Sequence, residues 1–138
     1  MNHHRHLAGV LCVLLMGIGA ASPADELVII LNKDNPQQVT AAAIARIYAG
    51  DMLTWENGSA ILVIDQGDTP SSAVFFGSFG KSYANYKATW TRLMFTGKAT
   101  PPKSLGSDAE VKAQVSANKA AIGYIKASSV DESVRSLK

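Results

Sequence analysis

The stretch AILVIDQGDTPSSAVFFGSF, residues 60–79, decides the predicted fold. Residues 61–64 are apolar and mostly β-branched, which predicts a strand. A polar turn follows at residues 65–69, and Pro70 suits the first position of an amphipathic helix. The apolar residues carried by this helix are Val74, Phe75 and Phe79. A strand, a short turn and a helix start often form a ligand-facing site, because the first N–H groups of a helix lack backbone partners.

Strand and helix signals also alternate on both sides of this stretch. Apolar runs at residues 27–31 and 121–125 predict strands that are buried on both faces. The side chains suited to capping further helices are Thr40, Ser82 and Ser107. The tail, residues 128–138, alternates weakly and predicts an edge strand or a helical turn. This order predicts one α/β domain, a central sheet of at least three strands flanked by helices.

Two sets of aromatic residues are candidates for the core or for a ligand platform. Trp55 precedes a turn sequence at residues 56–58. Further aromatic residues recur at helical spacing: Tyr83, Tyr86 and Trp90. Aromatic stripes of this kind are usually part of a core. We therefore expect both sets to pack inside the domain.

The N-terminal segment has the features of a secretory signal peptide. Its apolar run, residues 7–21, is shorter than the roughly 20 residues that span a membrane. Small residues near its end fit cleavage after Ala21 or Ala24. We expect residues 1–24 to be a cleaved signal peptide and residues 25–138 to be a periplasmic or secreted domain. A retained N-terminal anchor is the alternative.

Cleavage would leave a mature chain without histidine or cysteine. The residues lost are His3, His4, His6 and Cys12. Thiolate nucleophiles, Ser–His triads, zinc sites built from His or Cys, and disulfides are then excluded. Asp65 and Asp68 could pair for acid–base chemistry or hold a hard cation, but two acids in one turn are far more often solvated or capping residues. We predict no catalytic residue, no metal and no cofactor.

The charge of the chain is nearly balanced, with 13 Lys and Arg against 11 Asp and Glu. The basic residues are scattered without a run, whereas a nucleic-acid-binding face needs clustered cations. Nucleic acid is therefore not an expected partner. No membrane span is predicted in the mature chain.

Several segments together resemble a known family. Residues 47–50 (Ile-Tyr-Ala-Gly), with Trp55 and Gly58, are similar to the IF-x-G … W-x-x-G element of PstS-like proteins, the periplasmic phosphate-binding proteins of ABC transporters. Residues 121–125 are similar to the gaIGYv strand of the same family. The resemblance covers about residues 27–125. It implies an α/β fold, a single lobe of the type II periplasmic-binding-protein-like fold, whereas full-length members have two lobes that close over the anion.

The resemblance also implies where a ligand would bind. In full-length members the equivalent turn carries an Arg and a Gly-Ser-Gly-Thr segment that hold phosphate. The candidate ligand-binding residues here are Asp65, Gly67, Asp68, Thr69, Ser71 and Ser72. Asp65 stands where the Arg would be, and Pro70 removes one N–H donor. Each carboxylate would repel phosphate by about 1 kcal/mol or more, and the missing Arg contact would cost roughly 1.5–3 kcal/mol. We therefore expect phosphate binding to be weak.

Two functions are compatible with this sequence. The first is an exported, non-enzymatic domain like the substrate-binding proteins of phosphate ABC transporters, which binds a small anion or other solute weakly. Its second lobe would come from a partner protein or a homodimer. The alternative is a periplasmic protein-interaction module that has lost phosphate binding. The turn also has a purely structural interpretation, in which Thr69 caps the helix while Asp65 and Asp68 complement its positive end.

Overall fold

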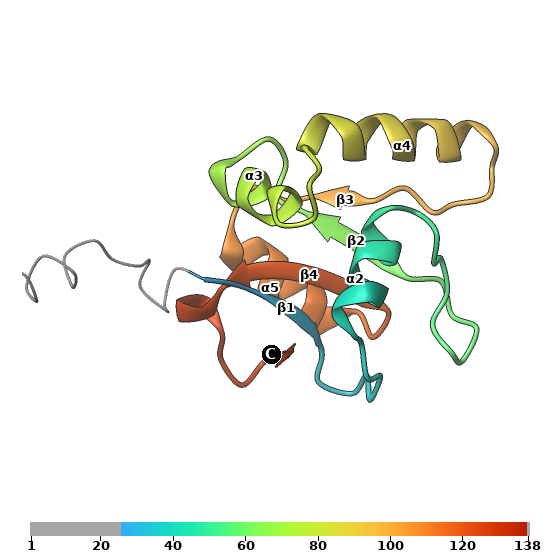
Figure 1. Cartoon of the computed structure of the whole chain (residues 1–138). Coiled ribbons are helices and arrows are strands. Elements are labelled where there is room, and N and C mark those ends of the chain that lie inside the picture. The colour runs from blue at the N-terminus through green and yellow to red at the C-terminus, as the bar shows by residue number, and fades with distance from the viewer. Residues whose placement is uncertain (1–25, 138) are drawn as a thin grey trace, which may run out of the picture.

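The computed structural model describes residues 26–137 (Figure 1). The predicted signal peptide, residues 1–24, lies outside the described residues. Within them, no helix combines the length and the apolar character that crossing a membrane requires. Strands and helices alternate along most of the chain, as the sequence predicts.

One five-stranded sheet forms the centre of the domain (Figure 1). The strands are β1 (Leu27–Asn32), β2 (Leu62–Asp65), β3 (Lys103–Ser104), β4 (Ala121–Lys126) and β5 (Val134–Leu137). Their order across the sheet is β3-β2-β4-β1-β5. β2 is parallel to its neighbours β3 and β4, whereas β1 is antiparallel to β4 and β5. The sheet is therefore mixed, and β2 ends at Asp65 between β3 and β4.

Helices connect and cover these strands. They are α2 (Ala41–Tyr48), α3 (Pro70–Gly77), α4 (Tyr83–Phe95), α5 (Asp108–Ala117) and the 3-10 turn η2 (Ala127–Ser129). The predicted caps are confirmed, because Thr40, Ser82 and Ser107 each accept the N–H of the third residue that follows. The caps show that local sequence fixes where these helices begin.

The helices cover both faces of the sheet. α2, α3 and α4 pack on one face around an aromatic core that includes Tyr48, Phe76 and Trp90. α5 packs on the other face, where Val111 contacts aliphatic side chains of the sheet. α5 approaches the sheet closely at Gly123 of β4, which has no side chain. A Cβ atom at this position would lie 2.7 Å from Val111 Cγ1. The fold is therefore the predicted sheet flanked by helices.

Most of the predicted packing is confirmed, with one error in α3. Trp55 and Trp90 are buried, as expected for core residues. Val74 was predicted on the apolar face of α3 but is 66% exposed, so this part of the prediction is wrong. Phe75 is buried as predicted, together with Ser72 and Phe76, and these three follow helical spacing. Phe79, predicted in the same helix, lies two residues beyond its end. The tail contains both predicted alternatives, the helical turn η2 and the edge strand β5.

Candidate functional site

The turn between β2 and α3 carries the predicted ligand-binding residues. It begins at Asp65, the last residue of β2, and ends at Thr69, the N-cap of α3. Thr69 Oγ1 accepts the N–H of Ser72 at 3.3 Å. Gly67 has a φ of 71°, a conformation that favours glycine. The cap and this glycine together fix the path by which the chain leaves the sheet.

Asp65 is buried inside the fold, with only 1% of its surface exposed. Its Oδ1 accepts hydrogen bonds from Ser104 Oγ at 2.8 Å, from Gly67 N at 2.8 Å and from Tyr83 OH at 3.2 Å. Its Oδ2 accepts one from Tyr86 OH at 2.6 Å. These four donors belong to the turn, α4 and β3. Both carboxylate oxygens are therefore engaged by neutral groups of the protein.

The two tyrosines beside Asp65 remain protonated donors at neutral pH. Burial raises the pKa of Tyr86 far above its ordinary value, and the charge of Asp65 raises it further. Burial also raises the pKa of Tyr83, and Asp65 adds to this effect against an opposing hydrogen bond from Ser104. Because a raised phenol pKa keeps the hydroxyl neutral, both groups retain the proton that they donate to the carboxylate.

A second set of buried contacts ties the turn to β4 and α5. Gln66 N donates to Tyr124 OH at 3.0 Å, and Gln66 Nε2 donates to Tyr124 O and Asp108 Oδ1, both at 2.8 Å. Ser72 Oγ and Tyr124 OH lie 2.6 Å apart and share a hydrogen bond. Burial is the main cause that raises the pKa of Tyr124 to about 12. Gln66 and Ser72 are therefore anchors of the turn.

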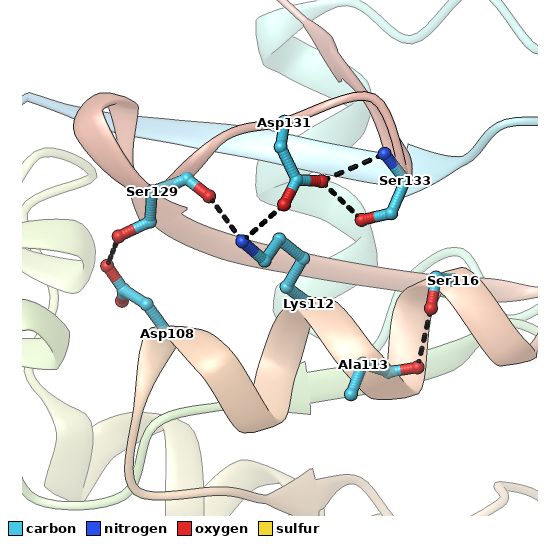
Figure 2. Close-up of polar contacts among 7 residues, drawn as sticks. All are labelled: Asp108, Lys112, Ala113, Ser116, Ser129, Asp131 and Ser133. Atoms are coloured by element: carbon cyan, nitrogen blue, oxygen red, sulfur yellow. Dashed lines mark hydrogen bonds and ion pairs between the residues drawn. The ribbon is translucent and has the colours of Figure 1, made fainter.

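Asp108, the first residue of α5, extends these contacts toward the C-terminal tail (Figure 2). Its Oδ2 accepts a hydrogen bond from Ser129 Oγ at 2.6 Å. The same oxygen accepts one from Lys126 N at 3.1 Å. Burial alone would raise the pKa of Asp108. The hydrogen bonds from Ser129, Gln66 and Lys126 N outweigh that effect and lower the pKa below its ordinary value. Asp108 is therefore held as a carboxylate between the turn and the tail.

A neighbouring ion pair fastens the tail to α5 (Figure 2). Lys112 Nζ donates to Ser129 O at 2.9 Å and to Asp131 Oδ2 at 2.7 Å. The other oxygen of Asp131 accepts the N–H and the hydroxyl of Ser133. The hydrogen bond from Lys112, followed by those from Ser133, lowers the pKa of Asp131. The tail thus contacts α5 at two successive turns of the helix, through Asp108 and Lys112.

The outer surface of the turn consists of the other predicted residues. Gly67, Thr69 and Ser71 are half-buried, and Asp68 is exposed. Within residues 26–137, the N–H groups of Asp68 and Ser71 make no hydrogen bond to the protein, as expected at a helix start. The N–H of Gly67 is already taken by Asp65, and that of Thr69 by Gly67 O. A small anion could thus receive two N–H groups here, but it would also meet the Asp68 carboxylate.

The structure therefore divides the predicted site residues into two groups, and their role in ligand binding stays a prediction. Asp65 and Ser72 are buried, whereas the other four form the outer turn. No sequence pattern indicates Ser104 as a partner of Asp65. Tyr83 and Tyr86 were expected in the core from their spacing, which does not tell where a hydroxyl points. No group of three His, Cys, Asp or Glu residues in the described chain could hold a metal ion.

The mixed sheet, the helices on both of its faces and the turn after β2 define one lobe of a periplasmic-binding-protein-like fold. Residues 24–137 match the family model described as the PBP superfamily domain. The chain belongs to this family, and its resemblance to PstS-like proteins is confirmed. No curated protein sequence matches it.

Two solved structures with a similar fold are proteins of phosphate transport. One is an ABC-type phosphate transport receptor from Vibrio cholerae, with 23% identity and a TM-score of 0.64 over 86% of this chain and 48% of that one. The other is a putative phosphate ABC transporter substrate-binding protein with bound phosphate from Clostridium perfringens. Its identity is 25% and its TM-score 0.62, over 91% of this chain and 49% of that one. This chain therefore spans about half the length of each.

Proposed function

We propose that this chain is an exported, non-enzymatic substrate-binding-type domain that binds a small anion or other solute weakly at the turn after β2. Export rests on the predicted signal peptide, residues 1–24. The observation that supports weak binding is the outer turn, where two N–H groups without protein partners lie beside an exposed carboxylate. The helix start attracts an anion, whereas Asp68 opposes it by about 1 kcal/mol or more. We expect phosphate affinity in the millimolar range.

Asp65 contributes to the proposed weak binding of phosphate in a different way. In the full-length proteins that the chain resembles, an Arg at this position holds phosphate. Here a buried carboxylate takes the Gly67 N–H for itself, so that donor is lost to any external anion. Replacing Asp65 would also leave Tyr86 and Ser104 without their acceptor. The sharper experiment therefore leaves Asp65 in place and changes Asp68.

Isothermal titration calorimetry of the purified protein with phosphate, sulfate and divalent cations tests the proposal. Asp68→Asn removes the exposed charge from the turn, and we expect it to tighten phosphate binding about fivefold, which corresponds to about 1 kcal/mol. The matched control is Glu56→Gln, which removes the same charge from an exposed loop that precedes β2. Because the turn lies at the other end of β2, we expect this control to bind as the parent does.

Two results would contradict the proposal. Micromolar phosphate binding by the parent would show that the turn holds the anion tightly despite its carboxylates. Equal phosphate affinity of the parent and Asp68→Asn would show that the anion binds elsewhere. Either result can be read directly from the same titrations.

The second candidate is a periplasmic protein-interaction module that has lost phosphate binding. Large exposed apolar side chains favour it, because Phe95 is 87% exposed and Met94 is 46% exposed at the end of α4. A partner protein or a second copy of the chain could cover them. Titrations that show no heat with any solute, together with a stoichiometric complex in solution, would support this function over the first.

A further inference from the structure

A groove between α2 and α4 lies apart from the turn after β2. Its volume is about 640 Å³, and its lining includes Phe76 near the end of α3 and Phe79 two residues beyond that helix. The turn lies at the start of α3, and this helix has eight residues. Phe76 lies about 9 Å along this helix from its first residue, and Tyr86, which also lines the groove, donates to Asp65 at the start of the turn. The groove is a second candidate binding surface of the domain.

The shape of the groove is elongated, because it follows one face of α4. The lining residues Asn85, Ala88 and Arg92 recur at intervals of three and four residues, the spacing of a single helical face. Lys81, just before α4, lines the other end. The axial distance along α4 from Asn85 to Arg92 is about 10 Å, and Lys81 extends the lining beyond the start of this helix. An extended occupant fits this length better than a compact solute.

The walls of the groove allow a close approach by another backbone. Ala45 and Ala49 line the α2 side, and Ala88 lines the α4 side. Between them lie the buried aromatic residues Tyr48 and Tyr86. Small side chains over an apolar floor are the surface against which a helix packs at a short interaxial distance, about 8–10 Å.

The rim of the groove carries an excess of positive charge. Arg46, Lys81 and Arg92 line it, against a single acid, Asp51. None of these cations forms an ion pair in the described part of the chain, where the ion pair found is Lys112 with Asp131. A second copy docked groove to groove would bring like charges together, which opposes association. The charge instead complements an acidic partner.

We propose that the groove between α2 and α4 binds an acidic amphipathic helix of a partner protein. Carboxylates near the two ends of that helix would meet Lys81 and Arg92, and small apolar side chains would lie against the alanine walls. The part of α4 that lines the groove corresponds to about two turns of helix, with Lys81 beyond its start, and the arrangement is the helix-in-groove mode of recognition. Phe95, three residues beyond Arg92 and 87% exposed, would be covered by the end of the bound helix. This site goes beyond the proposed function and does not depend on it.

Fluorescence anisotropy with labelled peptides tests this site. The probe is a helical peptide of about 14 residues with Ala and Leu on one face and Glu near both ends, and its matched peptide has Lys in place of Glu. We expect the acidic peptide to bind at least about tenfold more tightly than the basic one, with an affinity that falls as salt rises. Arg92→Glu is expected to weaken binding of the acidic peptide about tenfold or more.

Lys87→Glu is the matched control, because it makes the same charge reversal at an exposed position of α4 outside the groove lining. We expect it to change the affinity less than about twofold. Ala88→Trp fills the groove without changing charge and is expected to weaken binding about fivefold or more, with folding checked by circular dichroism. Equal binding of the acidic and basic peptides, or equal effects of Arg92→Glu and Lys87→Glu, would overturn the proposal. Asp68 does not line the groove, so we expect Asp68→Asn to leave peptide binding unchanged. Failure of the anion proposal is thereby distinguished from failure of this one.

Discussion

Two carboxylates hold the turn after β2, and they do so in different surroundings. Asp65 is buried and accepts hydrogen bonds from Tyr83, Tyr86, Ser104 and the Gly67 N–H. Asp108 is half-buried and accepts hydrogen bonds from Gln66, Ser129 and the Lys126 N–H. The first ties the turn to α4 and β3, and the second ties it to α5 and the tail.

The difference shows how burial decides what such a carboxylate contributes. Tyr86 is the buried donor to Asp65, and after the loss of Asp65 its hydroxyl would remain inside the protein, where water does not replace the missing acceptor. Of the donors to Asp108, Lys126 is exposed and Ser129 is half-buried, so water can hydrate both when the carboxylate is lost. Asp65, with four hydrogen bonds and a buried tyrosine donor, should therefore stabilise the fold more than Asp108, which has three.

The largest expected effect comes from Asp65→Ala. Because this change removes four hydrogen bonds and leaves the buried Tyr86 hydroxyl without its acceptor, we expect the free energy of unfolding to fall by about 3 kcal/mol or more. Urea denaturation followed by tryptophan fluorescence measures it. Tyr86→Phe removes one of the four hydrogen bonds and should cost roughly 1.5–3 kcal/mol, the range for bonds to charged groups.

If the free energy of unfolding of Asp65→Ala lay within about 1 kcal/mol of that of the parent, this comparison would be contradicted. It would mean that the buried carboxylate is no more important than an exposed one. It would also weaken the argument that Asp65 takes the Gly67 N–H away from an external anion.

Much of the fold could be predicted from the sequence because its signals are local. The apolar runs that form β1 and β4 and the caps at Thr40, Ser82 and Ser107 act within a few residues of themselves. β3 could not be predicted, since it has two exposed polar residues and exists through its pairing with β2. Val74 was misplaced because the face that α3 buries depends on the helices and the sheet around it.

The candidate site could be predicted in position but not in orientation. The strand, the turn and the cap at Thr69 are visible in the sequence, and the structure has them as expected. The direction of the Asp65 side chain depends on Tyr83, Tyr86 and Ser104, which lie 18, 21 and 39 residues further along the chain. No pattern near Asp65 distinguishes a carboxylate that faces a ligand from one that faces these hydroxyls.

A smaller and pH-dependent effect is expected for Asp108→Asn. The pKa of Asp108 is lowered in the folded protein, so its carboxylate stabilises the fold above the unfolded pKa of about 3.9. That stabilisation is lost as the pH falls through the lower, folded pKa. At pH 7 we expect the free energy of unfolding of Asp108→Asn to be about 1–2 kcal/mol lower than that of the parent. This difference between the two proteins should shrink below about pH 4.

Urea denaturation at a series of pH values measures this difference. The control is Glu132→Gln, an exposed acid in the same tail, which should follow the parent at every pH. The lowered pKa of Asp108 would be contradicted if the difference in the free energy of unfolding between Asp108→Asn and the parent grew toward low pH. If Asp108→Asn lowered the free energy of unfolding as much as Asp65→Ala does, the distinction between the two carboxylates would be removed.

The smallest effect is expected for Lys112→Met, which removes the ion pair with Asp131 and the hydrogen bond to Ser129 O. The Asp131 side chain is 52% exposed, and exposed pairs contribute little because water and salt screen them. We expect Tm to fall by about 3 °C or less, and the difference to narrow further in high salt. Lys119→Met, at an exposed position just beyond α5, is the control for loss of one cation. If Lys112→Met lowered Tm more than Asp108→Asn does, the tail would be held chiefly by the exposed pair, and the link from the tail to the turn through Asp108 would be the weaker of the two.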